Sequence, residues 1–393
     1  MNLTSPPVTR LPYPPAAEAR HVLVGCAYRF FGGLFAPAFR RPITLGELTH
    51  AKILIFKPCC LGDVLFATPL VRELRRALPS ARLVFGVGKH SRAAVATNPH
   101  LDDRFDTGPV GSGAYTTAEY LDLLRRIRAE RFDACFVLER SALLALLPRL
   151  AGVPRVIGID SGGRGFALNV GVSARPSRPE SELYLDLLRA IGGQPEDGAL
   201  EYQPTPAAEE RVRALLPDGL SRPLVVVHAA GGVNPGMVLT RKRWPGEHFR
   251  AIAERARRAG GTVVLVGGPE DRDTGSALGE VEGVVDLIGR LSLDELAALA
   301  RRADVYLGND SGPSHLAEAA GARVVMLFGP SDPLVYGPRG RNAVAVTAGL
   351  ACSPCFEDGR VAPCANVLCM PSLSVERVWR EVAEACGLGG EAP

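Results

Sequence analysis

The stretch DVYLGNDSGPSHLAEAAGARVVMLFG, residues 304–329, contains a complete strand–turn–helix–strand unit. Its apolar ends, 304–310 and 323–329, read as buried strands, and the segment 314–320 between them predicts a helix. The small residues of Ser311–Gly312–Pro313 supply the turn. Strands connected by a helix pair in parallel, so this stretch indicates a doubly wound α/β sheet.

The same alternation runs along the chain in two halves, which are separated by a Pro-, Gly- and Glu-rich segment at 194–206. We therefore expect an α/β protein with two Rossmann-like, doubly wound parallel-sheet domains facing a cleft. A pair of unrelated α/β domains with independent tasks is the alternative. The other predicted strands are 52–56, 82–87, 132–138, 155–159, 223–229, 262–268 and 284–289, and the other predicted helices include 63–78, 118–131 and 375–386.

The predicted domains are an N-terminal extension at 1–50, an N-terminal Rossmann-like domain at 51–203 and a C-terminal Rossmann-like domain at 204–393. Of the 393 residues, 47% are hydrophobic and 22% are charged, which excludes a disordered or fibrous chain. The formal net charge of +3 does not favour a nucleic-acid partner. No uncharged apolar run is long enough to predict a membrane-spanning helix. The nine cysteines do not suggest a disulfide scaffold, so a cytoplasmic protein is expected.

The first candidate site is the loop KPCCLGDVLFATP, residues 57–69. It follows a predicted strand, and Gly62 is expected to permit a sharp turn into the next helix. Asp63 then falls at or near the helix N-cap. Two roles stay open for its carboxylate: capping the helix, or acting as a general base on an acceptor hydroxyl.

Two loops in the second half of the chain suggest a phosphate site: the loop that follows the predicted strand 223–229 and ends at Pro245, and the loop at 308–321. Arg241, Lys242 and Arg243 precede Pro245, which is expected at the first helical position; the alternative is a solvated basic turn. In the loop at 308–321, Asp310 comes at the end of a strand, and the small residues after it would let a pyrophosphate approach the helix amides. His315 reads as a packed structural histidine. The usual dinucleotide, P-loop and zinc-protease motifs are absent from the sequence.

Taken together, these loops resemble glycosyltransferase family 9, the ADP-heptose:lipopolysaccharide heptosyltransferases and their relatives. The matching text is at 57–79, 240–245, 264–271 and 308–333. The resemblance implies the GT-B architecture and inverting transfer from a nucleotide sugar without a required catalytic cofactor. It also implies that Asp63 is the base.

The resemblance implies that the domain at 51–203 is the acceptor side and that the domain at 204–393 binds the nucleotide sugar. For this donor, it assigns the phosphates to Lys242 and the ribose to Glu270. It assigns the donor sugar and pyrophosphate to Asp310, Ser311 and Gly312. Two departures from the family pattern are Cys59–Cys60, where many relatives have small hydroxyl residues, and the additional Arg241 before Lys242.

Four cysteines near the C-terminus are spaced C-x2-C-x8-C-x4-C within the loop 352–369. Such a set suggests a structural zinc or iron site, with free thiols or a disulfide as alternatives. The resemblance extends to heptosyltransferases that modify autotransporter proteins and carry a four-cysteine metal site. The cysteines are Cys352, Cys355, Cys364 and Cys369.

In the N-terminal extension, the segment 28–41 mixes phenylalanines and a leucine with three arginines, which suits contact with the surface of the inner membrane or packing as a flap. The overall expectation is a heptosyl transfer from ADP-heptose to a lipopolysaccharide core or related glycan. The alternatives are another nucleotide sugar, a protein acceptor, or a non-catalytic nucleotide-sugar-binding module.

Overall fold

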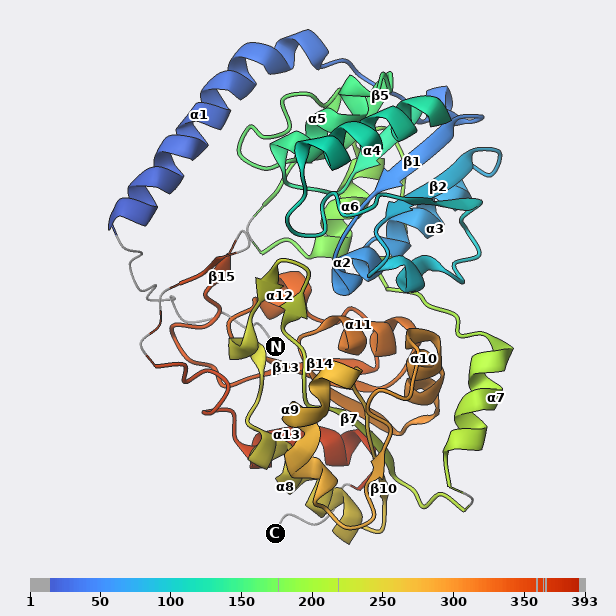
Figure 1. Ribbon diagram of the computed structural model, residues 1–393, viewed down its shortest axis with the longest axis vertical. Helices are drawn as coiled ribbons and strands as arrows, with labels where there is room; N and C mark the ends of the chain where they lie inside the picture. Colours follow the sequence, from blue (N-terminus) through green and yellow to red (C-terminus); the bar gives the residue numbers. More distant parts are fainter. Residues whose placement is uncertain are drawn as a thin grey trace. The chain divides into compact units, whose positions relative to one another are not determined.

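The computed structural model describes residues 15–175, 177–217, 219–357, 360–362, 364 and 366–388. The chain forms two units: an N-terminal unit, Tyr13–Leu200, and a C-terminal unit that contains Glu201–Pro393. Each is built on its own six-stranded sheet (Figure 1). The expectation of an α/β protein with two doubly wound parallel sheets is confirmed.

The N-terminal sheet has the strand order β3-β2-β1-β4-β5-β6, and all its described pairings are parallel. The first strand of the sheet in chain order, β1, lies in its middle, and the chain then builds the sheet outward in both directions. The connecting helices therefore fall on both faces of the sheet. Helices α2, α3 and α6 pack together, and α4 packs on α5. Strand β1 is apolar and buried on both sides. The strands are β1 Lys52–Phe56, β2 Arg82–Val87, β3 Asp103–Asp106, β4 Ala134–Val137, β5 Arg155–Asp160 and β6 Val170–Ser173. The helices are α1 Pro15–Phe39, α2 Leu61–Phe66, α3 Thr68–Ala77, α4 Thr117–Glu130, α5 Ala142–Leu150 and α6 Glu180–Arg189, with 3-10 turns Leu45–Leu48 and Arg92–Val95.

The C-terminal sheet repeats this topology, with the order β11-β10-β7-β12-β13-β14 and parallel pairings. Helices α8, α9 and α13 share one face, and α7, α10 and α11 share the other. The strands are β7 Leu224–His228, β10 Thr262–Leu265, β11 Val285–Asp286, β12 Val305–Asn309, β13 Val324–Phe328 and β14 Ala343–Thr347, with short hairpin strands β8 Val233–Asn234, β9 Met237–Val238, β15 Phe356–Glu357 and β16 Arg360–Val361. The helices are α7 Pro206–Leu215, α8 Gly246–Arg258, α9 Arg272–Gly279, α10 Leu293–Arg302, α11 Gly312–Ala319, α12 Pro333–Tyr336 and α13 Val375–Ala385, with 3-10 turns Thr240–Lys242 and Pro269–Asp271.

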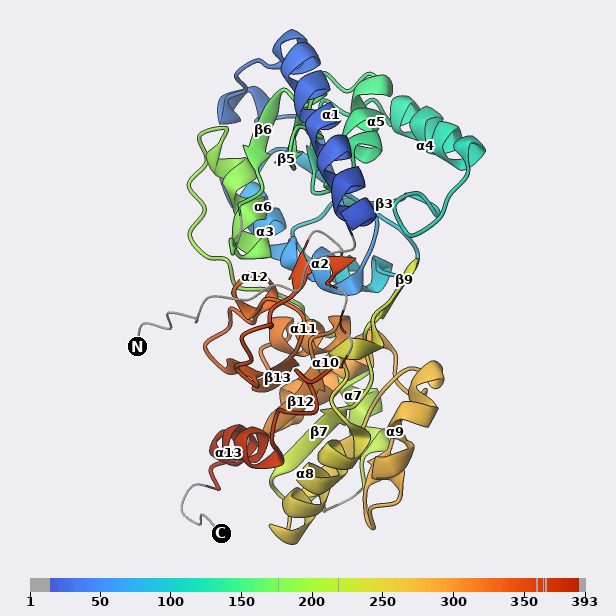
Figure 2. The same cartoon turned by 90° about the vertical axis from the view of Figure 1, so that its left-hand side faces the viewer.

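Several elements differ from the sequence-based expectations. The single helix expected at 63–78 is two helices, α2 and α3, because Pro69 opens a new helix in the first turn of α3. Strands β3, β6 and β14 were not predicted. The final helix α13 does return to the core: Val378 and Val382 are buried in the C-terminal cluster, and α13 lies beside α8 (Figure 2).

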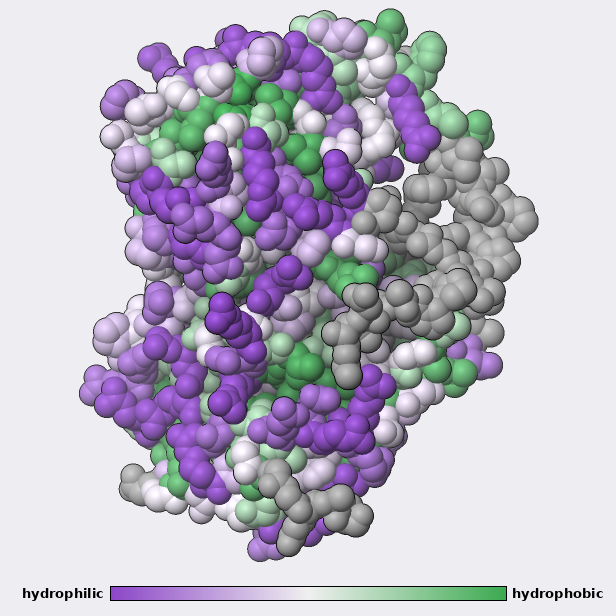
Figure 3. Space-filling view, turned by 180° about the vertical axis from the view of Figure 1, so that it is seen from behind, coloured by the Kyte–Doolittle hydropathy of each residue, from purple (hydrophilic) through white to green (hydrophobic). Residues whose placement is uncertain are grey.

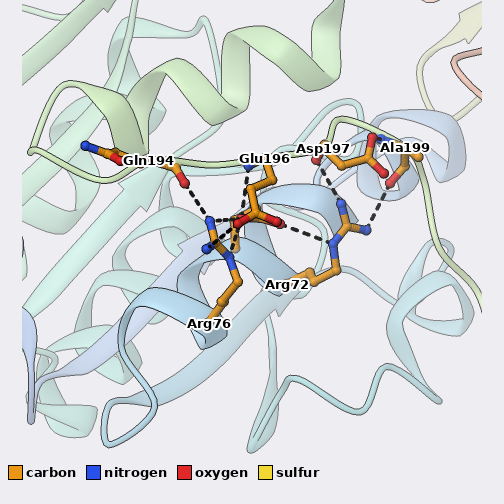
Figure 4. Close-up of polar contacts among 7 residues, drawn as sticks. Arg72, Arg76, Gln194, Glu196, Asp197 and Ala199 are labelled. Carbon is orange, nitrogen blue, oxygen red and sulfur yellow. Dashed lines mark hydrogen bonds and ion pairs between the residues drawn. The ribbon is translucent and has the colours of Figure 1, made fainter.

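The segment that leaves the N-terminal unit is fastened to α3 (Figure 4). Arg72 donates to the carbonyl oxygens of Asp197 and Ala199, at 2.8 and 3.1 Å. Arg76 donates to the Gln194 carbonyl and to the carboxylate of Glu196. Both arginines also contact the buried Glu73. Charged side chains therefore hold a stretch that has no regular secondary structure of its own.

Helix α1 contacts the N-terminal unit at three residues of its C-terminal half, Tyr28, Gly32 and Phe39. Gly32 is buried, and a β-carbon there would lie 2.9 Å from the carbonyl oxygen of Gly163, so only glycine allows this approach. The Arg164 guanidinium lies over the ring of Tyr28, and Asn169 donates to the Phe39 carbonyl. Within the described part of the chain, no helix is both long enough and apolar enough to span a membrane.

Candidate active site

In the N-terminal unit, the loop between β1 and α2 brings Asp63 into an ion-pair cluster. The Lys57 ammonium lies 3.1 Å from the Asp63 carboxylate and 2.8 Å from that of Glu139. Lys57 is at the carboxyl end of β1 and Glu139 follows β4, and these strands are neighbours in the sheet. Lys57 is buried, while the Asp63 side chain is 33% exposed. Asp63 is therefore the member of the cluster that a second reactant can reach.

The cluster holds more carboxylates than cations. Burial alone would lower the pKa of Lys57, but the charges of Asp63 and Glu139 outweigh it and raise that pKa well above its usual value. Burial raises the pKa of Glu139, against the opposing charge of Lys57. The ammonium consequently stays protonated and holds Asp63 in place. Neither Lys57 nor Glu139 was singled out from the sequence, although both follow strands whose carboxyl ends meet at one sheet edge.

Asp63 does not cap the helix. Helix α2 begins at Leu61 with Cys60 as its N-cap, and no side chain caps it, so the capping hypothesis is wrong. The sharp turn lies at Cys60, whose φ of 72° is in the left-handed region, whereas Gly62 is inside the helix. The prediction of a turn at Gly62 is wrong by two residues, because a non-glycine residue adopts the unusual conformation.

In the C-terminal unit, Lys242 and Asp310 lie together at the carboxyl end of the sheet. Lys242 lies in the basic loop, in the 3-10 turn Thr240–Lys242, and its ammonium is 2.7 Å from the carboxylate of Asp310, which follows β12. His315 donates from the other side at 3.2 Å, and its ring is also near Glu318. Burial would raise the pKa of Asp310, but Lys242 and His315 hold it far below its usual range. The result is a buried carboxylate between two cations.

The side chain of Asn309 fixes the surrounding backbone. Its amide oxygen accepts from the backbone N–H of Trp244, and its amide nitrogen donates to the carbonyls of Ala229 and Ala230. Pro245 is the N-cap of α8 rather than its first residue. Ser311 is the N-cap of α11, and Gly312 is its first residue. No side chain caps this helix end. Pro313 has no N–H, and the amides of Ser314 and His315 donate to the Ser311 carbonyl. The Gly312 amide and the Ser311 hydroxyl are thus the groups at this helix start that face no backbone acceptor and suit an anionic group.

Glu270 lies in the 3-10 turn after β10 and is exposed, with its carboxylate over Gly268. Its neighbour Asp271, which the sequence did not single out, accepts from the Gly268 N–H and lies 3.6 Å from the buried His228. Burial would raise the pKa of Asp271, but the hydrogen bond with His228 outweighs it and lowers that pKa. The structure places Glu270 on the surface of this unit and gives the inner position to Asp271.

The cysteine-rich loop is attached beside the basic loop. The amides of Cys355 and Phe356 donate to the Pro330 carbonyl, and Lys242 lies over the Phe356 ring at 5.3 Å. Burial and then the neighbouring Cys352 raise the pKa of the Cys355 thiol, and burial and Cys355 raise that of Cys369. The sulfur atoms are therefore neighbours. Even so, within the described residues no group of three or more His, Cys, Asp or Glu side chains is placed to hold a metal ion.

The buried histidine makes the stability of the C-terminal unit depend on pH. Burial would lower the pKa of His315, but Asp310 and Glu318 raise it from 6.5 to about 9. A raised pKa stabilises the fold below the unfolded value, and this contribution disappears as pH rises through the folded value. We expect the free energy of unfolding to fall by on the order of 3 kcal/mol between pH 6.5 and about 9.

This loss can be followed by urea unfolding with tryptophan fluorescence, because both tryptophans, Trp244 and Trp379, belong to the C-terminal unit. The variant His315→Gln should be less stable at pH 6.5 and should lack most of the decline. An equal decline in His315→Gln would assign the pH dependence to another group.

Comparison with known proteins places these loops in a family. The family model described as "Glycosyltransferase family 9 (heptosyltransferase)" matches residues 120–366. The chain belongs to glycosyltransferase family 9. It is 28% identical over 308 residues to the lipopolysaccharide heptosyltransferase 2 of Escherichia coli K12, covering 74% of this chain and 86% of that protein. The chain is therefore a glycosyltransferase, as the sequence predicted.

The fold of this family 9 enzyme is likewise that of solved GT-B relatives. The E. coli ADP-heptose lps heptosyltransferase II aligns with a TM-score of 0.68 and 21% identity, covering 86% of this chain and 99% of that one. The iron-containing dodecameric glycosyltransferase TibC from enterotoxigenic E. coli aligns with a TM-score of 0.53 and 16% identity, covering 88% and 77%. The predicted GT-B fold class is confirmed.

Proposed function

We propose that this enzyme transfers a heptose from ADP-heptose to a hydroxyl of a lipopolysaccharide core, with inversion at the anomeric carbon. The observation that carries the proposal is the Lys242–Asp310–His315 group beside the uncapped start of α11. A lysine, the Gly312 amide at the helix start and the Ser311 hydroxyl suit a diphosphate, and a neighbouring carboxylate suits sugar hydroxyls. The family match and the names of its relatives support heptose and lipopolysaccharide as the reactants.

In the proposed reaction, the acceptor hydroxyl oxygen attacks the anomeric carbon while the bond from that carbon to the phosphate oxygen breaks. Asp63 takes the hydroxyl proton, and ADP leaves with the bonding electron pair. Lys242, the Ser311 hydroxyl and the amide of Gly312 stabilise the charge that develops on the leaving diphosphate. Glu270 is assigned to the ribose. Lys57 acts as a positioning residue, because its buried ammonium is paired with Asp63 and Glu139.

A donor panel tests this function. The purified enzyme is incubated with ADP-heptose, UDP-sugars or GDP-sugars and with either a heptose-deficient lipopolysaccharide or a protein acceptor. Transfer from ADP-heptose to the glycolipid, with NMR showing the opposite anomeric configuration in the product, is the expected result. Retention of configuration would contradict the inverting mechanism, and transfer only from another sugar or only to protein would contradict the reactants. Nucleotide-sugar binding without any transfer would indicate a binding module.

The cysteine-rich loop 352–369 is proposed to hold one structural zinc or iron ion. Four thiols form a donor set that suits either metal, and the sulfur atoms lie near one another although they are not gathered around one point. Elemental analysis of protein purified without added metal should then find about one zinc or iron per chain. The double variant Cys355→Ser/Cys369→Ser should lose it, with Cys26→Ser as the control. Metal-free protein of unchanged stability would refute this site.

Helix α1 is proposed to hold the enzyme against the inner membrane from the cytoplasmic side. Leu23, Phe30 and Leu34 recur at helical spacing on the side of α1 opposite Gly32. The side chains of Phe30 and Leu34 are 70% and 62% exposed. Hydrophobic residues gather at this end of α1 in the space-filling view (Figure 3, upper right). Between residues 15 and 41 there are four arginines and one acidic residue, which favours an anionic lipid surface.

Vesicle binding tests this contact. The enzyme should sediment with phosphatidylglycerol vesicles more strongly than with phosphatidylcholine vesicles. The variant Phe30→Asp/Leu34→Asp should bind at least about 10-fold more weakly, because two apolar side chains no longer enter the lipid. Leu143→Asp is the matched control, since Leu143 is also 55% exposed on the same unit. Equal vesicle binding by both variants would show that α1 is not the contact.

A further inference from the structure

Two adjacent thiols stand in the loop that carries the proposed base, and the proposed mechanism uses neither. The Sγ atoms of Cys59 and Cys60 are 2.9 Å apart, and both side chains are free cysteines. Cys59 is buried and Cys60 is partly exposed. A small reagent can therefore reach the pair from the Cys60 side.

The backbone is what brings these thiols together. In an extended chain, consecutive side chains point to opposite faces. Cys60 instead has a φ of 72° and a ψ of 117°, which turns its side chain back toward Cys59. A conformation of this kind is unfavourable for a non-glycine residue, and such strain concentrates at functional sites.

The contact also makes the two thiols chemically unequal. The hydrogen bond from Cys60, helped by the nearby charge of Lys57, outweighs burial and lowers the pKa of Cys59. The same bond raises the pKa of the Cys60 thiol. A thiol with a lowered pKa beside a second thiol is the pairing that reacts with oxidants and exchanges disulfides.

We propose that Cys59 and Cys60 form a covalent modification site for thiol-directed oxidants and for trivalent arsenicals. With hydrogen peroxide, the Cys59 sulfur attacks one peroxide oxygen, which gives a sulfenic acid and releases one water. The Cys60 sulfur then attacks the Cys59 sulfur and a second water leaves, so two thiols and one peroxide yield one disulfide and two waters. With phenylarsine oxide, both sulfurs bind the arsenic and one water is released.

Modification would also reach Asp63. The Cys60 carbonyl accepts the first helical hydrogen bond of α2, from the Val64 N–H at 3.0 Å, and Asp63 is the residue before Val64. Closing a ring at Cys60 changes the conformation that starts this helix. We infer that the modified enzyme loses transfer activity because its base is displaced, and this part rests on the proposed function.

The chemical part is tested by mass spectrometry after limited peroxide or phenylarsine oxide treatment. The peptide containing Cys59 and Cys60 should lose two hydrogens with peroxide and gain one phenylarsenic group with the arsenical. Cys59→Ser and Cys60→Ser should each abolish both products. Cys26→Ser and Cys135→Ser are the controls and should retain them. Products confined to the cysteines of 352–369, or an unmodified Cys59–Cys60 peptide, would overturn the proposal.

The functional part is tested by rate and binding on the same samples. Oxidation should lower transfer by roughly 10- to 100-fold, the scale of a misplaced catalytic group, and dithiothreitol should restore it. ADP affinity should not change, because its proposed site lies in the other unit. Cys60→Ser, compared with its own untreated rate, should be insensitive to peroxide. Formation of the disulfide with full activity would leave the modification site standing and remove Asp63 as the base that it controls.

Discussion

Replacing Asp63 with asparagine is expected to lower the rate of sugar transfer by about 100- to 10,000-fold, the usual contribution of a general base. The amide cannot accept the proton of the acceptor hydroxyl, but it has nearly the same shape as the carboxylate. Because Asp63 caps no helix, folding should be little affected. Lys57 keeps Glu139 as its partner, at 2.8 Å. The measurement is kcat for transfer, together with calorimetric titration of ADP and the thermal midpoint.

The matched control is Asp122→Asn, which removes an exposed carboxylate from the same unit. It should transfer sugar at nearly the parent rate. If Asp63→Asn retained activity within a few-fold of the parent, the base would have to be sought elsewhere. A large fall in ADP affinity together with the rate would point to general damage.

Replacing Lys242 with alanine is expected to weaken ADP binding by roughly 10- to 100-fold, the effect of losing one charge-assisted contact of about 1.5–3 kcal/mol. Asp310 keeps His315 as a partner, so the buried carboxylate is not left without a cation. Isothermal titration with ADP alone measures the affinity. The donor should lose affinity by a similar factor, because the proposed contact is to the phosphates that both ligands share.

Arg241→Ala is the control for this variant, since it removes a neighbouring cation of the same loop. In the sequence, the additional Arg241 leaves the register of this loop open by one residue. The structure gives Lys242 the contact with Asp310 at 2.7 Å, so Arg241→Ala should affect ADP less. The reverse order would move the phosphate contact to Arg241, and two unaffected variants would reduce the loop to a solvated turn.

The sequence predicted the strands that are apolar throughout and the loops that follow them. Strands β1, β7, β12 and β13 are continuous apolar runs, because both of their faces are covered. The edge strand β3 reads DRFD, which is too polar to be recognised, and only pairing with β2 identifies it. Asp63, Lys242 and Asp310 could be named because each follows a strand in a loop of recognisable pattern.

The partners of these residues could not be named in the same way, since they depend on tertiary contact. Glu139 reaches Lys57 across two strands that are 82 residues apart in sequence. His315 was correctly expected to be packed, but its bond to Asp310 depends on the turn geometry at Ser311. The turn at Cys60 could not be predicted from residue preferences, because a positive φ is usually adopted by glycine and Gly62 is only two residues away. The outward apolar face of α1 is visible only once Gly32 is seen to meet Gly163.

The histidine behind Asp310 has a consequence for how a nucleotide could enter and leave. A lysine that serves an incoming phosphate must share its ammonium with that phosphate, and in most buried pairs the abandoned carboxylate would resist the exchange. Here the imidazolium of His315 is a second cationic partner of Asp310, at 3.2 Å. Asp310 thus has a second counter-ion besides Lys242. The Lys242 ammonium can therefore bind a phosphate of the ligand without leaving the buried carboxylate unpaired. The resting site is thereby poised for exchange, and alkaline pH, which discharges the imidazolium, should tie the lysine more firmly to the protein.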